Sequence, residues 1–325
     1  MDFFVNTSHD PAFNLALEEE LATGFGGEFF MLWRNGPSII VGRNQNTAAE
    51  IDSAAVRKLG IPVVRRITGG GAVYHDLGNL NYTIARDGRK LESASFAECA
   101  GVVVAALNKM GIPAEFSGRN DILVSGRKVS GSAKSVLRER TLFHGTMLFD
   151  VDMSVLGRVL KPDETKIRSK GVKSVRSRVM NLRELFPQWS MEDFLHVFQQ
   201  VLMKALGVAA AQPPPPEFIY RAEKLADERY RTTEWNYGSA YPYDFNRRAR
   251  FSGGSVELSA RISENRIAEL TLHGDFFGDA PAEELTRLLT GTVFRPEAVA
   301  ERLAAVDLDR FMHGISASEL ASLFE

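Results

Sequence analysis

Three consecutive glycines, Gly69 to Gly71, are the first residues whose types and spacing point to chemistry. Glycine lets the backbone approach a ligand closely and turn its N–H groups toward an anion, and the preceding Arg65 and Arg66 add positive charge. A phosphate is the ligand that suits such a loop, whereas the glycines taken alone favour a tight hairpin turn with surface arginines. The segment is neither a dinucleotide-binding fingerprint nor a Walker loop, because the Gly-x-x-x-x-Gly-Lys spacing is absent.

A second group of polar residues surrounds Asp121 and Lys128. Asp121 begins an apolar run, and its carboxylate could hold Mg²⁺ on a triphosphate. Lys128 follows across a predicted turn, from which its amine could reach a carboxylate or an α-phosphate. Taken alone, however, Lys128 is more often a solvated lysine on a polar hairpin, since most lysines are surface charges.

Two further side chains, His144 and Cys99, have reactive groups but a weaker context. His144 lies in the middle of a predicted strand beside Gly145, and a histidine in that setting is more often a hydrogen-bonded core residue. Cys99 lies on a predicted helix dominated by valine and leucine, which favours a small apolar filler over a nucleophile. The six histidines show no paired spacing of a metal site, so a zinc enzyme is excluded.

Composition limits the class of protein that these residues belong to. Of the 325 residues, 44% are apolar and 25% are charged, which is typical of a globular protein with about two domains. The formal net charge of −2 gives no sign of a nucleic-acid partner. The single cysteine excludes an internal disulfide. No signal-like amino terminus or long apolar run is present, so we expect a cytoplasmic protein without a membrane segment.

The elements that would position these groups mix helix and strand, with turns between short strands that favour antiparallel pairing. We therefore expect an α+β fold with mixed or antiparallel sheets. Helices are predicted at 10–21, 52–59, 95–110 and 190–206. Strands are predicted at 29–34 and 38–43, as a hairpin, and at 61–66, 72–74, 80–85, 122–124, 128–131 and 141–151.

The pattern changes near Arg250, where a hairpin at 255–262 and 267–273 precedes three short helical patterns. We therefore expect two domains, residues 1–246 and residues 247–325, of which the second is a small α+β unit. Between the strand predicted at 141–151 and the helix predicted at 190–206, the basic, serine-rich stretch 161–183 is predicted to be a loop.

Taken together, the segments resemble the bacterial lipoate-protein ligase A family. The similarity runs in the family's order from about residue 10 to 185 and continues more weakly toward the carboxy terminus. It is carried by FNLALEEEL, LWRNGPSIIVGRNQN, RRITGGGAVYHDLGNLNYT, SGRNDILVSGRKVSGSA, FHGTMLFDVDMS and KGVKSVRSRVMNL. The resemblance implies a catalytic domain of the fold shared with biotin-protein ligases and related to class II aminoacyl-tRNA synthetases. It also implies a small carboxy-terminal accessory domain.

The implied chemistry is a ligation in two steps. ATP with Mg²⁺ activates lipoate as lipoyl-adenylate, and a lysine of an apo lipoyl domain then attacks to form an amide. The implied acceptors are acyltransferase subunits of 2-oxoacid dehydrogenases and the glycine-cleavage H protein, and the ligase itself is expected to be a monomer. Such a site needs fixed N–H donors and cations around the α-phosphate, which the glycine loop, Arg66 and Lys128 can provide.

The family's site residues carry over position by position. Lys128 is expected to be the catalytic lysine that contacts both lipoate and the adenylate, and Asp121 the residue near the metal. Residues 170–181 match the family's loop that closes on the adenylate. The expected ATP and adenylate contacts are Arg66, Gly71, Ala72, Val73, Tyr74, Asn120, Asp121, Lys128, Arg176 and Arg178. The expected lipoate contacts are Gly70, Gly71, Lys128 and His144.

Two other functions stay open from the sequence. An octanoyl or lipoyl transferase of the same superfamily would work without ATP through a cysteine thioester, and only Cys99 is available for this. A non-catalytic protein that binds lipoyl domains is the other alternative, although the joint presence of Arg66, Asp121 and Lys128 argues against it. A biotin ligase is disfavoured, because the motifs follow the lipoate pattern throughout.

Overall fold

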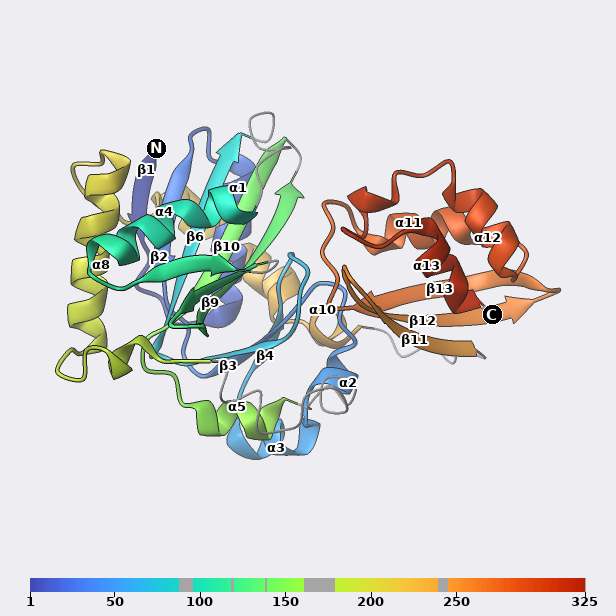
Figure 1. Cartoon of the computed structure of the whole chain (residues 1–325), viewed down its shortest axis with the longest axis horizontal. Coiled ribbons are helices and arrows are strands. Elements are labelled where there is room, and N and C mark those ends of the chain that lie inside the picture. The colour runs from blue at the N-terminus through green and yellow to red at the C-terminus, as the bar shows by residue number, and fades with distance from the viewer. Residues whose placement is uncertain (88–95, 118–119, 138, 161–178, 239–244, 325) are drawn as a thin grey trace.

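The computed structural model describes residues 1–87, 96–117, 120–137, 139–160, 179–238 and 245–324 (Figure 1). Its larger part is built on a seven-stranded sheet in which the first pair of strands is parallel and the other pairs are antiparallel. The strand order is β1 (Asp2–Val5), β2 (Phe29–Trp33), β6 (Asn79–Asp87), β10 (Arg140–Leu148), β9 (Arg127–Leu137), β8 (Asp121–Val124) and β7 (Ala114–Ser117).

The two faces of this sheet differ because side chains alternate along each strand. One face is apolar and packs against α4 (Phe96–Lys109) and α8 (Met191–Leu206), with Tyr82 and Phe143 in the shared core. The other face mixes polar side chains such as Thr83 and His144 with apolar ones. It packs against α1 (Pro11–Gly24) and a small sheet of β4 (Val63–Arg65), β3 (Ser38–Val41) and β5 (Val73–His75).

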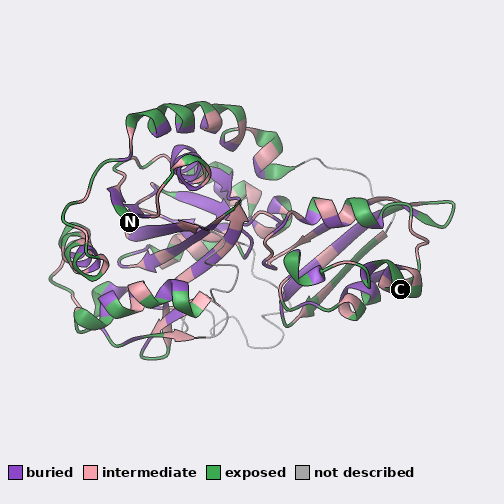
Figure 2. Ribbon diagram, turned by 90° about the horizontal axis from the view of Figure 1, so that it is seen from above, coloured by how far each residue is buried: buried purple, intermediate pink, exposed green. Residues whose placement is uncertain are grey.

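Shorter elements pack around the small sheet and α1, except η2, which adds Leu182 to the core beside α4 and α8. Figure 2 shows that the helices turn their buried residues inward and their exposed residues outward. Among the described residues, none of the helices is both long and apolar enough to span a membrane. The shorter elements are α2 (Thr47–Glu50), α3 (Ser53–Leu59), α5 (Met153–Val159), η2 (Leu182–Glu184), α9 (Pro216–Leu225), η3 (Ala226–Tyr230) and α10 (Thr233–Tyr237).

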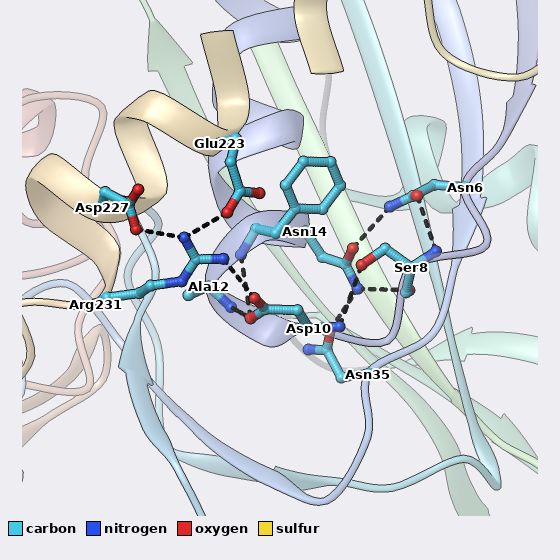
Figure 3. A network of polar contacts seen from close by, with 10 residues as sticks. Asn6, Ser8, Asp10, Ala12, Asn14, Asn35, Glu223, Asp227 and Arg231 are labelled. Carbon is cyan, nitrogen blue, oxygen red and sulfur yellow. Dashed lines mark hydrogen bonds and ion pairs between the residues drawn. The ribbon is translucent and has the colours of Figure 1, made fainter. Parts of the chain in front are cut away.

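A network of polar contacts fixes the start of α1 (Figure 3). Asp10 caps the helix by accepting from the backbone N–H groups of Ala12 and Phe13, and its other oxygen binds Arg231 at 2.6 Å. Arg231 also binds Glu223 and Asp227, which ties the cap to α9 and η3. One turn into the helix, the buried Asn14 amide donates to Asn35 Oδ1 and to the carbonyls of Ser8 and Arg34. These contacts set the position of the inward face of α1.

The carboxy-terminal part has a separate three-stranded antiparallel sheet and its own apolar core. Its strands are β11 (Phe245–Phe251), β12 (Gly254–Ser263) and β13 (Arg266–Gly274). Its helices are α11 (Ala282–Leu289), α12 (Pro296–Leu303), η4 (Leu308–Arg310), α13 (Ala317–Ala321) and η5 (Ser322–Phe324). The strand β11 begins at Phe245, so it spans the expected boundary between residues 246 and 247.

The α+β class with mixed and antiparallel sheets is confirmed, but the hairpin expected at 29–34 and 38–43 is wrong. Strand β2 belongs to the large sheet, whereas β3 pairs with β4 and β5 in the small one. Between them the N–H of Gly36 donates to the carbonyl of His9, a contact from outside the segment that turns the chain away from a hairpin. The predicted helix at 95–110 is present from Phe96 to Lys109, and residue 95 lies outside the described residues.

Candidate active site

The glycine loop, Gly69 to Gly71, connects β4 to β5 and is held from within by Arg66. The Arg66 guanidinium donates to the carbonyls of Gly69 at 2.6 Å and Gly71 at 2.9 Å, and its Nε donates to Thr68 Oγ1 at 3.0 Å. Gly70 has a φ of +90°, which favours glycine. The buried Arg66 side chain therefore fixes the backbone conformation of the loop.

The two arginines before the loop, both expected to add positive charge there, have different partners. Arg65 points toward α10 and donates to the carbonyls of Trp235 and Asn236 and to three carbonyls of residues 42–45. Both residues are 7% exposed, and burial lowers the pKa of each guanidinium to about 10. Arg65 is therefore a structural residue, and Arg66 acts on the loop carbonyls in the described structure.

The residues after Gly70 differ in their exposure to solvent. Gly71 is exposed, and Ala72 and Val73 are partly exposed at the start of β5. Tyr74 instead turns its ring into an apolar core with Ile39 and Val63, where burial raises the pKa of its hydroxyl to about 12. Of the predicted nucleotide contacts in this segment, Tyr74 therefore has its side chain in this core, and its backbone pairs with Ile39 of β3.

A chain of buried side chains lies beneath the loop on the mixed face of the large sheet. His144 Nε2 lies 2.8 Å from Thr68 Oγ1, and its Nδ1 lies 2.8 Å from Glu18 Oε2. Glu18 also accepts from Thr83 at 2.6 Å. Glu18 and Thr68 were not among the site residues predicted from the sequence. A signal for Glu18 was present, because it lies four residues after Asn14 and three before Leu21, on the inward stripe of α1.

Lys128 and Asp121 form the second group, on the hairpin of β8 and β9. The two strands meet at a turn in which Ser125 and Gly126 have positive φ, and a bulge shifts the register between Ile122 and Leu123. Lys128 Nζ lies 2.6 Å from Asp121 Oδ1, and each side chain is about one-third exposed. The lysine stem crosses Gly131, where an added Cβ would lie 2.6 Å from Nζ.

Other contacts around this hairpin involve the backbone of β9. Asn120 Nδ2 donates to the carbonyl of Ser132 at 2.6 Å, which links the start of β8 to β9 at the open end of the hairpin. The carbonyl of Lys128 accepts from the N–H of Met180, and Val179 pairs beside it as an isolated bridge. Arg176 and Arg178, which the sequence assigned to the adenylate, lie outside the described residues.

Strand β10 brings the two groups onto one face of the sheet. Thr146 exchanges hydrogen bonds with the backbone of Gly131, beside the Lys128 stem, and His144 two residues earlier contacts Thr68 below the glycine loop. Residues two apart on a strand point to the same side. The geometry therefore joins the glycine loop, His144, Lys128 and Asp121, which the sequence had placed in separate segments.

Several buried polar atoms near this face lack a partner among the described residues: His75 Nε2, Asn79 Oδ1 and Asn81 Nδ2. Asn81 pairs in register with Thr146, so its amide belongs to the same row of the sheet. Unpaired buried polar atoms are costly, so they mark places where a bound molecule or water completes the structure. Within the described ranges, no group of three His, Cys, Asp or Glu side chains could hold a metal ion by itself.

The carboxy-terminal part touches the glycine loop directly. The N–H of Gly70 donates to the carbonyl of Phe276 at 3.3 Å, and the carbonyl of Asn44 accepts from Gly274 at 2.7 Å. A Cβ on Gly70 would lie 2.9 Å from the Phe277 ring. The small residues of the loop thus serve a second purpose, because they let the β13–α11 connection lie against it.

Comparisons with known proteins give matches over nearly the whole chain. A family model of the lipoyl protein ligase A/B catalytic domain matches residues 10–203, and one of the bacterial lipoate protein ligase C-terminus matches residues 240–324. The lipoate-protein ligase LplJ of Bacillus subtilis (strain 168) is 36% identical over 320 residues, which cover 97% of each chain.

Solved structures give the same result. LipL1 of P. falciparum in complex with lipoate superposes with a TM-score of 0.79 at 25% identity, over 94% of both chains. A lipoate-protein ligase A bound with ATP gives 0.64 at 28% identity, over 73% of this chain and 98% of that one. A bipartite lipoate protein ligase from Thermoplasma acidophilum, described with its E2 lipoyl domain, gives 0.66 at 28% identity, over 75% and 98%.

Proposed function

The chain belongs to the lipoate-protein ligase family, and from this we propose that it uses ATP to join lipoate to a lysine of apo lipoyl domains. It is an ATP-dependent ligase. An oxygen of the lipoate carboxylate attacks the α-phosphorus of ATP, so that a mixed anhydride, lipoyl-adenylate, forms and pyrophosphate leaves. The lysine amine then attacks the acyl carbon, an amide forms, AMP leaves, and the amine gives up its proton.

The observation that carries this proposal is the position of Lys128 across Gly131, on the same face as the glycine loop. Bringing a carboxylate to an α-phosphate places two anions in contact, and a fixed ammonium between them stabilises the charge that develops. Lys128 is about one-third exposed, so substrate oxygens can reach Nζ and compete with Asp121 for it. The glycine loop and Ala72 supply backbone donors for the phosphates.

Asp121 fits a role beside a magnesium ion. Its carboxylate is about one-third exposed at the start of β8, and Mg²⁺ in nucleotide sites is usually held by one or two carboxylates together with substrate phosphates and water. The ion, when bound, neutralises phosphate charge. Asp121 also orients Lys128 through its carboxylate, so the same residue would contact both the magnesium ion and the Lys128 ammonium.

A thioester transferase is the competing function, and the position of Cys99 disfavours it. Cys99 is buried on α4, in the core on the opposite face of the sheet from His144 and Thr146. Burial raises the pKa of its thiol, which keeps it in the unreactive protonated form. A thiol in that place cannot form the acyl enzyme that such a transferase needs.

The acceptors that we propose are the lipoyl domains of 2-oxoacid dehydrogenase acyltransferase subunits and the glycine-cleavage H protein. The Thermoplasma acidophilum relative is described together with an E2 lipoyl domain, which supports an acceptor of this kind. A monomeric state and a cytoplasmic location stay predictions of the sequence.

We also propose a division of work between the two parts of the chain. Residues 1–246 hold the groups for activation, and residues 247–325 form an accessory domain that acts in transfer. The bipartite relative supports this division, because 98% of it is covered by only 75% of the present chain.

The function is tested by intact mass spectrometry of an apo lipoyl domain incubated with this protein, lipoate and Mg-ATP. We expect a mass gain equal to one lipoyl group. The same gain without ATP would identify a transferase, and no gain in either mixture with several apo lipoyl domains would contradict the ligase.

A further inference from the structure

The Arg65 guanidinium gathers backbone carbonyls from two segments that lie far apart in the sequence. Its Nη1 donates to three carbonyls of loop 42–45, at 2.9, 2.9 and 2.7 Å: those of Gly42, Arg43 and Gln45. Its Nε and Nη2 donate to the carbonyls of Trp235 and Asn236 on α10, at 2.8 and 3.1 Å. The guanidinium carries five N–H donors in one rigid plane, so a single side chain holds both segments.

Within loop 42–45, the carbonyl of Asn44 is the one that Arg65 does not bind. This carbonyl accepts from the N–H of Gly274 at 2.7 Å. Gly274 is the last residue of β13, so the hydrogen bond joins the larger part of the chain to the carboxy-terminal part. Because the carbonyls on both sides of Asn44 are held by Arg65, the direction of the Asn44 carbonyl is set by Arg65 as well.

Loop 42–45 also lies against the glycine loop. The N–H of Arg43 donates to the carbonyl of Thr68 at 2.8 Å, and a Cβ on Gly42 would lie 2.0 Å from the carbonyl oxygen of Gly70. The N–H of Gly70 in turn donates to the carbonyl of Phe276, in the connection that follows β13. The carboxy-terminal part therefore rests on two neighbouring loops of the larger part.

The charge of Arg65 has a counterpart in the carboxy-terminal part. The groups that its guanidinium contacts, backbone carbonyls and the hydroxyl of Thr47, are all neutral. Burial lowers the pKa of Arg65, and the carboxylate of Glu283, in the first turn of α11, acts in the opposite direction. A negative charge across the junction thus favours the charged form of a buried cation.

We propose that Arg65 builds the docking site on which the carboxy-terminal part rests. Its guanidinium holds loop 42–45 so that the Asn44 carbonyl is offered to Gly274. It also ties α10, which precedes β11 in the chain, to the same place, and its charge attracts Glu283. Arg65 is a positioning residue, because it places the carboxy-terminal part relative to the glycine loop without touching a substrate. This inference goes beyond the proposed reaction and does not depend on it.

Hydrogen exchange of the Gly274 amide, followed by NMR in the ligand-free, full-length protein, tests the proposal. Glycine labelled with nitrogen-15 and histidine labelled with carbon-13 at the carbonyl mark the three His-Gly pairs of the sequence, at Gly145, Gly274 and Gly314. Each signal is assigned by its loss when the preceding histidine is replaced by asparagine. Gly145 lies in β10 of the large sheet, and the N–H of Gly314 donates to Asp309 within the carboxy-terminal part, so these two amides report on each part by itself.

The first variant is Arg65→Lys. Lysine keeps the positive charge, but its compact ammonium has three donors instead of a planar fork and cannot hold both segments. We expect Gly274 to exchange at least about tenfold faster than in wild type, while Gly145 and Gly314 change less than about threefold.

Two further variants complete the comparison. Arg140→Lys is the matched control, because Arg140 also donates to two carbonyls, those of Phe25 and Gly27, which take no part in the docking site. It should leave the exchange rate of Gly274 at the wild-type value. Glu283→Gln, at an exposed position, removes only the attracting charge and should speed the exchange of Gly274 by about two- to fivefold.

A residue that only stabilised the fold would speed the exchange of all three glycine amides together, because they would exchange through the same global unfolding. Equal acceleration of the three amides in Arg65→Lys, or a wild-type rate at Gly274, would overturn the proposal. If Arg65→Lys does not fold, Glu283→Gln decides, and an unchanged rate at Gly274 in that variant would overturn it. None of these measurements needs turnover, so a failure of ligation would contradict the proposed function alone.

Discussion

His75 and His144 lie on neighbouring sheets beneath the glycine loop, and their Nδ1 atoms have opposite roles, because that of His75 accepts a hydrogen bond and that of His144 donates one. Asn35 Nδ2 donates to His75 Nδ1, since Asn35 Oδ1 is engaged by Asn14, so the His75 proton is on Nε2. His144 has its proton on Nδ1, where Glu18 accepts it. Both rings depend on α1 for these states, because Asn14 and Glu18 lie one turn apart on its buried face.

Burial makes His75 a source of acid sensitivity. Burial, together with the charge of Arg66, lowers its pKa from 6.5 to about 3. Between these values the unfolded chain binds a proton that the folded chain does not, so the free energy of unfolding falls as the pH falls. The slope from this ring is about 1.4 kcal/mol per pH unit.

We therefore predict that His75→Asn weakens the pH dependence of stability between pH 6 and 4, by about 1 kcal/mol per pH unit. The measurement is urea unfolding at a series of pH values. His273 and His313 also titrate with shifted pKa, but both are present in wild type and variant and cancel in the comparison. His196→Asn, at an exposed position on α8, is the control and should keep the wild-type slope. Parallel curves for His75→Asn and wild type would contradict the buried neutral ring.

The glycine loop allows a matched pair of substitutions. Gly70→Ala forces a side chain into φ +90° and against the Phe277 ring, so we expect a loss of stability of about 1–3 kcal/mol. At Gly71 an added Cβ meets no atom within 4 Å and the backbone needs no left-handed conformation, so Gly71→Ala should unfold at the wild-type temperature.

The second variant then tests the predicted substrate contact at Gly71. We expect Gly71→Ala to reduce adenylate formation at least about tenfold while its thermal unfolding is unchanged, because the new methyl group occupies the exposed side of the loop. Wild-type kinetics in Gly71→Ala would remove this residue from the binding site. Equal melting temperatures for both variants would show that the Phe277 contact does not constrain Gly70.

Features that depend on neighbours in sequence could be predicted, and those that depend on distant partners could not. The helices predicted at 10–21 and 52–59 are present as α1 and α3, because their ends depend on local residues: Asp10 caps α1, Pro11 begins it, and Gly60 ends α3. The prediction of a hairpin at 29–34 and 38–43 was wrong because the N–H of Gly36 donates to the carbonyl of His9, which lies outside that segment.

The arrangement of the candidate site also depends on residues far apart in the sequence, so it could not be predicted from local patterns. The glycine loop and Lys128 were identified as separate motifs, and their shared face depends on the pairing of β10 with β9 and β6. Glu18 was missed because its partner His144 is 126 positions away in the chain. Arg65 and Arg66 look equivalent in sequence, yet one binds carbonyls near α10 and the other holds the loop.

The buried thiol of Cys99 gives a simple test between ligase and transferase. We predict that Cys99→Ala keeps ligation within about threefold of wild type and loses on the order of 1 kcal/mol of stability, because a small buried group is removed from the core. Activity is followed by the mass of the lipoyl domain, and stability by urea unfolding. A stable Cys99→Ala protein without activity would support a thioester route instead.

Lys128 is the residue on which the proposed activation depends most. Its ammonium lies beside Asp121 in the resting structure, and it gains most when carboxylate and α-phosphate oxygens come together, so its interaction strengthens in the transition state. Removing a donor of this kind costs about 10²- to 10³-fold in rate. We predict that Lys128→Ala folds normally and forms lipoyl-adenylate at least about a hundredfold more slowly.

Transfer from chemically supplied lipoyl-adenylate should also be slower in Lys128→Ala, since the same ammonium holds that intermediate. Lys128→Arg should restore little, because a planar fork does not replace a compact ammonium in the space above Gly131. Lys58→Ala, at an exposed position on α3, removes the same charge away from the site and is the control. The deciding measurement is single-turnover adenylate formation at saturating ATP and lipoate, where a wild-type rate in Lys128→Ala would exclude this lysine from the mechanism.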